Sequence, residues 1–413
     1  MRYDSSTKEM FTITLLTIIS ISCVFAQPIN SEPFADLHPD VGLSVIELIQ
    51  KYKYPIERHR NIETDDGYLL EMHRIPYGLK SGPAENKPVV FVMHGLLSSS
   101  ADWVNMGPEK SLGFLLADLG YDVWMGNARG TTYSRNHISL DPDKYKSDFW
   151  DFSWNEIGEY DLPAMIDYVL SYTKQEKLFY IGHSQGTTSF YVMCSEKPAY
   201  NNKIRVMISL APVAYMDHME NPLFRFVAAF DGPLEFLTQL IGIAEFLPDI
   251  EFLGSIGKVF CKDGAIFQEV CAGVIFLIGG FDSEQLNRTM IPVIMTNTPA
   301  GAATKQLLHY AQDINSGEFR KYDYGLIQNL IKYGSVSPPS YNLNKITAPV
   351  AMIYSKNDWL AATVDVERLA IELPNMVYKY LIPFEKFNHL DFLWAVDIIP
   401  LVYNYVFDLL KQY

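Results

Sequence analysis

Short apolar runs with strand-like character recur along the chain, and longer helix-like segments separate them. Continuous apolar runs of this length are typical of strands that are buried on both faces of a sheet. Their alternation with helices favours a mostly parallel central sheet flanked by helices. The predicted fold class is therefore α/β, with strands expected at Pro88–Met93, Tyr121–Met125, Leu178–Ile181, Val206–Leu210, Pro349–Tyr354 and Val377–Ile382.

This alternation stops between residues 214 and 340. Within that region the segment Phe224–Phe260 combines Phe, Leu and Ile with Gly and Pro breaks, which predicts an inserted helical cap. The core then consists of an N-terminal part, 27–213, and a C-terminal part, 341–413. One domain with an insertion fits this order better than two tandem domains, and 413 residues with 48% hydrophobic content can bury a large core.

The N-terminus carries an apolar run from Phe11 to Phe25 that ends in small residues suited to signal peptidase. The run is too short to span a membrane comfortably. We therefore predict a secretory signal at residues 1–26, cleaved after Ala26. No later segment reaches about 18 uninterrupted apolar residues, so no transmembrane segment is expected. The predicted location is extracellular, with the lysosome as the alternative.

Removal of the signal takes Cys23 with it and leaves Cys194, Cys261 and Cys271. An odd number in an oxidising compartment indicates one pair and one free thiol. Cys261 and Cys271 are close enough in sequence to close a small loop, whereas Cys194 lies in an apolar stretch and is expected to be buried and free. The alternative is that all three thiols are reduced and buried. A sequon at Asn287 predicts a glycosylation site and agrees with secretion.

Charge and motif content exclude several kinds of partner. The chain has a net charge of −15, which repels polyanions, so nucleic acid is not an expected partner. The turn Gly126–Gly130 lacks the pattern of a dinucleotide or phosphate loop and is interpreted as structural. No spaced cluster of His and Cys indicates a metal site. We expect no metal, no cofactor and no obligate protein partner.

The pentapeptide Gly182–Gly186 has the pattern of a nucleophile elbow, a tight strand-to-helix turn that exposes the hydroxyl of its central serine. Small residues are required on both sides of that serine. Leu178–Ile181 is strand-like immediately before the turn, and Thr187–Cys194 can continue as a helix after it. Ser184 is therefore the predicted nucleophile.

A serine hydroxyl is a poor nucleophile unless a histidine takes its proton and a carboxylate fixes that histidine. With this elbow the acid and then the histidine are expected downstream, each on a loop after a later strand. Asp358 follows the predicted strand ending at Tyr354, and His389 follows the run that ends at Phe384. His309 lies in helix-like sequence and is not expected to take part. The alternative for His389 is a surface loop histidine beside Asp391.

Two backbone amides are needed to stabilise the oxyanion that forms when the serine attacks. Gln185 directly follows the nucleophile and supplies the first. The segment His94–Leu97 directly follows an early strand, so the amide of Leu96 is the predicted second donor.

With these residues in place, the chain resembles the acid lipase family, which contains the gastric lipases, lysosomal acid lipase and many secreted insect and nematode lipases. The resemblance covers nearly the whole mature chain. It implies an α/β-hydrolase fold with Ser184, Asp358 and His389 as the triad and the amides of Leu96 and Gln185 as the oxyanion hole. It also implies a cap over an apolar cleft and a disulfide between Cys261 and Cys271. The matching segments are Thr64–Tyr68, His73–Pro76, His94–Leu97, Gly120–Trp124, Gly126–Gly130, Tyr160–Ala164, Gly182–Thr188, Leu210–Ala214 and Asn388–Phe392.

The resemblance makes hydrolysis of lipid esters through an acyl-enzyme the leading functional hypothesis. The expected substrates are triacylglycerols and sterol esters at an oil–water or membrane interface. The cap is interpreted as a lid that opens at such a surface, or otherwise as a folded subdomain with an ordinary core. Two alternative functions remain: a carboxylesterase for small soluble esters, and a non-catalytic lipid-binding protein that keeps the fold.

Overall fold

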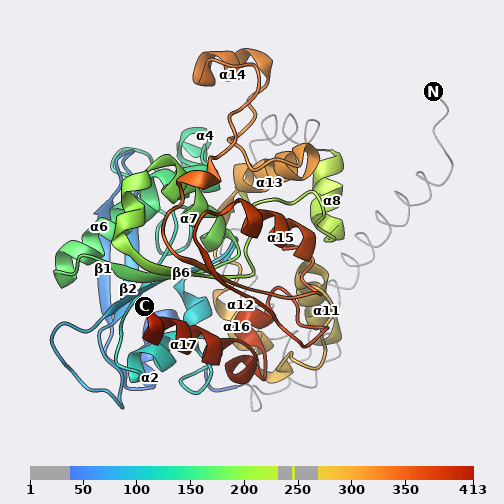
Figure 1. Cartoon of the computed structure of the whole chain (residues 1–413). Coiled ribbons are helices and arrows are strands. Elements are labelled where there is room, and N and C mark those ends of the chain that lie inside the picture. The colour runs from blue at the N-terminus through green and yellow to red at the C-terminus, as the bar shows by residue number, and fades with distance from the viewer. Residues whose placement is uncertain (1–37, 231–243, 247–267) are drawn as a thin grey trace. The chain divides into compact units, whose positions relative to one another are not determined.

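The computed structural model describes residues 38–230, 244–246 and 268–413 of the chain (Figure 1). The predicted signal at residues 1–26, together with Cys261 and the side chain of Cys271, lies outside the described residues. The division into core and cap at residues 213 and 340 stays a prediction.

An eight-stranded sheet forms the centre of the fold, in the order β1-β2-β4-β3-β5-β6-β9-β10. Six of these strands pair in parallel, namely β3, β4, β5, β6, β9 and β10. The other two, β1 and β2, join one edge in antiparallel pairing. All six strands expected from the sequence belong to the sheet, which confirms the predicted α/β class. The strands are β1 Glu57–Glu63, β2 Leu69–Ile75, β3 Val89–Met93, β4 Asp122–Gly126, β5 Leu178–His183, β6 Ile204–Leu210, β9 Val350–Tyr354 and β10 Met376–Leu381.

The antiparallel strands β1 and β2 were not expected from the sequence. Much of β1 is exposed, and it carries charged residues where an apolar alternation would have marked a strand. Its Arg58 and Arg60 both pair with Glu71 on β2. Cross-strand ion pairs therefore stabilise this edge in addition to buried apolar side chains such as Ile62 and Leu70, and they interrupt the apolar runs by which strands were sought.

Helices cover both faces of the sheet, and each face has its own core (Figure 1). Along β3 the side chain of Phe91 joins the core under α6 and α7, whereas Val90 and Val92 join the opposite core. Successive residues of a strand point to opposite faces, so a strand that is covered twice must be apolar throughout. The covering helices are α6 Leu162–Thr173, α7 Gln185–Glu196 and α15 Thr363–Glu372 on one face, and α2 Val45–Lys51, α3 Leu112–Asp118 and α17 Asn404–Gln412 on the other.

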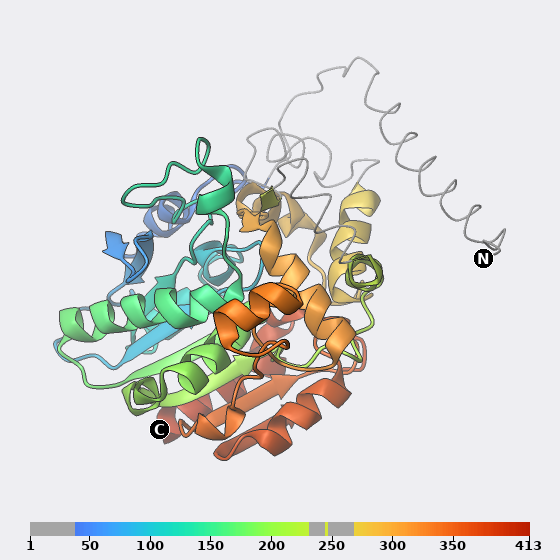
Figure 2. The same ribbon diagram turned by 90° about the horizontal axis from the view of Figure 1, so that it is seen from above.

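Between β6 and β9, the described residues add no strand to the eight-stranded sheet. The described part of this region consists mainly of helices and loops, coloured from yellow-green to orange in Figure 2, and Figure 1 shows α8 and α13 next to each other and α14 set apart from them. None of the helices in the described ranges is both long and apolar enough to cross a membrane. The helices are α8 Pro222–Ala229, α11 Gln268–Gly279, α12 Ile291–Asn297, α13 Thr304–Ser316 and α14 Leu326–Tyr333, with a two-stranded pair of β7 Glu245–Phe246 and β8 Ala302–Ala303.

The turn after β4 carries a buried arginine that joins three parts of the core. The side chain of Arg129 is 0% exposed, and its Nε donates to Asp161 at 2.7 Å. Its two terminal nitrogens donate to Asp66, in the β1–β2 turn, at 2.5 and 2.8 Å. The guanidinium also lies 4.0 Å from the ring centre of Tyr68. This network accounts for the Gly126–Gly130 turn as a structural element.

Removal of the Arg129 charge should strongly destabilise the protein, because two carboxylates would lose their partner and Asp161 is fully buried. We expect Arg129→Leu to lower the free energy of unfolding by about 3–5 kcal/mol. Arg135 is the matched control, since it also pairs with two carboxylates but is 28% exposed. Arg135→Leu should cost less than about 1 kcal/mol. Urea unfolding measures both, and equal losses would contradict the prediction.

Candidate active site

Ser184 occupies a strained turn between β5 and α7. Its backbone has φ 53° and ψ −120°, a conformation that non-glycine residues rarely adopt. The Ser184 amide donates to the Leu210 carbonyl at 3.1 Å, and the Ser184 carbonyl accepts from the Thr187 amide at 2.8 Å. These bonds fix the turn on both sides, so the structure has the strand–turn–helix geometry of a nucleophile elbow.

Gly186 allows this turn to pack against the neighbouring strand. A Cβ atom at this position would lie 2.4 Å from the Met93 carbonyl oxygen and 2.9 Å from that of His94. Both are backbone atoms, which cannot rotate away as a side chain could. The second glycine of the pentapeptide, Gly186, is therefore required because α7 and the end of β3 are in close contact.

We expect Gly186→Ala to lower the free energy of unfolding by about 1–3 kcal/mol, because the added methyl group has no space. Gly273 in α11 is the matched control, since an added Cβ there meets none of the described residues within 4 Å. Gly273→Ala should leave stability unchanged or raise it, because alanine favours helix. Thermal unfolding of both variants checks the difference, and a neutral Gly186→Ala would show that the elbow can relax.

The structure brings Asp358 and His389 into direct contact. His389 Nδ1 lies 2.8 Å from each carboxylate oxygen of Asp358. Asp358 Oδ1 also accepts from the amides of Leu360 and Ala361 at 2.9 and 2.8 Å. Asp358 follows β9 and His389 follows β10, so two adjacent parallel strands deliver the two side chains to the same place. Both residues are buried.

His389 Nε2 is free to act on a third group. With Nδ1–H donating to Asp358, the Nε2 atom carries the lone pair. It is buried and has no hydrogen-bond partner among the residues that the structure describes. Ser184 and His389 line the same pocket, although no hydrogen bond joins them here. Hydrogen bonds between such groups are often longer without substrate and tighten when it binds.

His183, the residue before Ser184, holds the loop that carries His389. Its Nε2 donates to the backbone carbonyl of His389 at 2.9 Å. Burial lowers the pKa of His183 well below its usual value, and the neighbouring His389 acts in the same direction, so this imidazole stays neutral. The sequence analysis gave His183 no role, because its partner lies 206 residues further along the chain.

The predicted oxyanion donors lie on the two segments next to Ser184. Gln185 is the first residue of α7, where backbone amides have no acceptor within the helix. Leu96 belongs to the loop after β3, and a Cβ on the preceding Gly95 would lie only 3.1 Å from Ser184 Cβ. The side chain of Gln185 donates to Gln306 of α13 at 2.6 Å. This bond joins the elbow to the predicted insertion, residues 214–340, which we call the inserted region.

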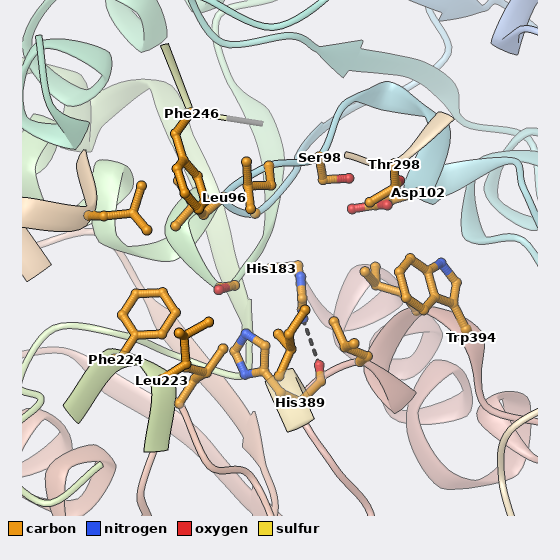
Figure 3. Close-up of a pocket in the computed structure, with 18 residues that line it drawn as sticks. Leu96, Ser98, Asp102, His183, Leu223, Phe224, Phe246, Thr298, His389 and Trp394 are labelled. Atoms are coloured by element: carbon orange, nitrogen blue, oxygen red, sulfur yellow. Dashed lines mark hydrogen bonds between the residues drawn. The ribbon is translucent and has the colours of Figure 1, made fainter. Parts of the chain in front are cut away.

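The pocket around Ser184 and His389 is a cavity of about 150 Å³ (Figure 3). Loops of the core form one part of its wall, and helices of the inserted region form the other. Most of the lining side chains are apolar, which suits a lipid rather than a charged ligand. The apolar lining residues are Leu96, Leu97, Leu223, Phe224, Phe246, Ile278, Leu307, Leu360, Leu390, Leu393 and Trp394.

A pair of carboxyl groups lies behind the His389 loop. Burial, together with the negative charges of Asp282 and Asp358, raises the pKa of Asp391 to about 9. Asp391 thus keeps its proton at neutral pH beside Asp282, while its Oδ2 accepts from the Asn388 amide at 2.7 Å. This pair connects the inserted region to the loop that carries His389.

The raised pKa of Asp391 predicts a loss of stability as pH rises. The unfolded chain releases this proton above about pH 4, whereas the folded chain keeps it until about pH 9. The contribution of this carboxyl to the free energy of unfolding is therefore fully present below pH 4 and decreases as the pH rises toward 9. Asp391→Asn cannot titrate, and its amide can still donate to Asp282. We expect the melting temperature of the variant to gain on the wild type between pH 5 and 8; parallel curves would contradict this.

The remaining predicted site residues lie away from the pocket. Cys194 is buried and free, as predicted, and burial raises the pKa of its thiol. Asn287 is partly exposed and accepts from the Thr289 hydroxyl at 2.6 Å. Its glycosylation and the Cys261–Cys271 disulfide stay predictions. His309 stacks on Trp154 with ring centres 3.7 Å apart, which agrees with its exclusion from the triad.

One group of side chains within the described ranges has the spacing of possible metal ligands, namely Asp217, His218 and Asp365. His218 Nδ1 bonds Asp365 at 2.7 Å, and the His218 amide donates to the same carboxylate at 3.0 Å. None of the three lines the pocket around Ser184. The group is accounted for by its own hydrogen bonds.

Comparison with known proteins agrees with the fold and with the family resemblance. Residues 45–107 match a family described as a partial α/β-hydrolase lipase region, and residues 88–240 match the α/β-hydrolase fold family. Lipase 3 of Drosophila melanogaster is 46% identical, over 98% of this chain and 100% of that protein. Human gastric triacylglycerol lipase is 38% identical, over 96% and 98% of the two chains. Human lysosomal acid lipase/cholesteryl ester hydrolase is also 38% identical, over 91% and 92%.

Among solved structures, that of DcsB in complex with a substrate analogue has a TM-score of 0.51 at 12% identity, over 87% of this chain and 99% of that chain. At this identity the likeness concerns the fold alone. The central sheet and the strand-to-helix turn at Ser184 define an α/β hydrolase. The near full-length relatives make the assignment more specific: the chain belongs to the acid lipase family.

Proposed function

We propose that this protein hydrolyses carboxylic esters of lipids through a covalent acyl-enzyme formed on Ser184. The observation that carries the proposal is the His389–Asp358 hydrogen bond at 2.8 Å, which directs the free Nε2 of His389 into the pocket that contains Ser184. A strained serine, an oriented imidazole and a buried carboxylate are together what nucleophilic acyl transfer requires.

The proposed reaction has two halves. Ser184 Oγ attacks the ester carbonyl while His389 Nε2 takes its proton, and Asp358 stabilises the imidazolium that forms. The amides of Leu96 and Gln185 stabilise the negative charge on the carbonyl oxygen. His389 then protonates the departing alcohol, which leaves the acyl group on Ser184. Water attacks this ester with His389 again as the base, and the carboxylic acid is released.

The substrates we propose are triacylglycerols and sterol esters at an oil–water or membrane interface. The apolar pocket supports a long acyl chain, and the names of the human relatives include both ester classes. We further propose that residues 214–340 act as a cap that opens at such a surface. This is supported by Leu223, Ile278 and Leu307, which belong to the region and line the pocket.

We also propose that the protein is secreted, as the apolar segment near the N-terminus and the sequon at Asn287 support. One relative is named as a gastric enzyme and another as a lysosomal one. Glycosidase treatment of protein collected from the medium of expressing cells would test both secretion and modification at Asn287.

Fatty-acid release from emulsified trioleoylglycerol tests the proposed function. We expect Ser184→Ala to lose at least about a thousandfold in rate, because neither His389 nor Asp358 can replace the nucleophile. Ser195→Ala is the matched control. Ser195 lies on α7, the helix that follows Ser184, and its buried hydroxyl donates to the Val192 carbonyl of that helix. It should retain activity.

Three other results would contradict the proposal in different ways. Equal rates for wild type and Ser184→Ala would mean that another nucleophile acts. Activity confined to dissolved short esters would favour a carboxylesterase. Saturable lipid binding by a wild type that never releases fatty acid would favour a non-catalytic lipid carrier.

A further inference from the structure

One end of the pocket is polar, and its polar groups lack well-aligned hydrogen-bond partners among the described residues. Ser98, Asp102 and Thr298 lie together there, with Trp394 on the same side (Figure 3). Leu223, Phe224 and Phe246 lie at the opposite end, and His389 lies between the two ends. We call Ser98, Asp102, Thr298 and Trp394 the polar end.

Asp102 is the least expected member of the polar end. Its side chain lies on the short helix η1, Ser100–Trp103, and is only 2% exposed. Among the described residues neither carboxyl oxygen has a well-aligned hydrogen bond, although the Ser98 hydroxyl lies near enough to lower the pKa of Asp102. Ser98 Oγ, Thr298 Oγ1 and Trp394 Nε1 also have no well-aligned partner among these residues. A buried polar group without a partner costs about 1–3 kcal/mol. Four such groups in one place indicate a site that a ligand completes.

The chemistry of the polar end specifies the ligand. Trp394 Nε1 can only donate, the Ser98 and Thr298 hydroxyls can donate and accept, and the Asp102 carboxyl supplies acceptors. No lysine or arginine lines the pocket within the described residues, so an anionic group would find no counter-charge. Burial raises the pKa of Asp102 to about 7, so below that pH the carboxyl is mostly neutral and can donate as well. The simplest organic group that is neutral and both donates and accepts is a hydroxyl.

We propose that the polar end binds a free hydroxyl group on the alcohol part of the ester. Triacylglycerols have no such hydroxyl, but the di- and monoacylglycerols that their hydrolysis releases do. The enzyme then favours these partial glycerides over esters of equal size without a free hydroxyl near the scissile bond. The inference rests on the proposed function for the location of the scissile ester at Ser184. The apolar end takes the acyl chain, and the position of His389 between the two ends agrees with this division.

Glyceryl monobutyrate and propyl butyrate test the proposal, because they share the acyl chain and the three-carbon alcohol and differ in two hydroxyls. Both esters dissolve in water, so adsorption to an oil–water interface does not affect the measured rates. We expect kcat/KM to favour glyceryl monobutyrate by at least about tenfold, because a site with buried polar groups discriminates against an analogue that leaves them unpaired. Thr298→Val and Asp102→Leu should each reduce that preference by about tenfold.

Thr304→Val is the matched control. The Thr304 hydroxyl is also buried without a partner, but it does not line the pocket, so the preference should be unchanged. Asp102→Leu should also raise the melting temperature, because it removes an unpaired buried carboxyl. A carboxyl with a purely structural role would give a lower melting temperature and the same preference.

Calorimetric binding of the two esters to Ser184→Ala separates this inference from the proposed function. A preference for glyceryl monobutyrate that disappears when Thr298→Val is added supports the polar end, even if the wild type hydrolyses neither ester. Hydrolysis of both esters by the wild type with equal kcat/KM, or equal affinities in every variant, overturns it and leaves the polar end as a site for water alone.

Discussion

Parallel pairing of the strands is the constraint on which the candidate active site depends. Strands that run in the same direction end at the same edge of the sheet, so the loops that follow them lie side by side. The loop with Leu96 follows β3, Ser184 follows β5, Asp358 follows β9 and His389 follows β10. Residues from four distant parts of the chain therefore meet without any local sequence pattern joining them.

A second set of buried hydrogen bonds holds these loops in position. His183 donates to the backbone of His389, and Asn388 Nδ2 donates to the Gly280 carbonyl at 3.0 Å. Asp282, which comes before the strand β9, also raises the pKa of Asp391 beside His389. The loop that carries the proposed base is thus bonded both to the elbow and to the inserted region. A displacement of the region between β6 and β9 would therefore also displace the loop that carries His389.

Much of this architecture follows from the sequence because its physical causes are local. Strands covered on both faces must be apolar throughout, and all six expected strands are present. The contact between Asp358 and His389 followed from chain order and the positions of strand ends. The strands β1 and β2 were missed because ion pairs such as Arg58–Glu71 stabilise that edge. The surroundings of His183 and Asp102 depend on segments that meet only in three dimensions, so no local pattern reveals them.

The order of the strands along the chain also has a consequence for biosynthesis. Ser184 and its elbow are complete well before the ribosome reaches β9 and β10, because the whole inserted region comes between them. Chains emerge N-terminal part first, and early segments begin to collapse while later ones are still absent. A nascent chain therefore carries the proposed nucleophile without its base or acid. Ester cleavage by the proposed triad must therefore wait until β9, β10 and the His389 loop have been synthesised.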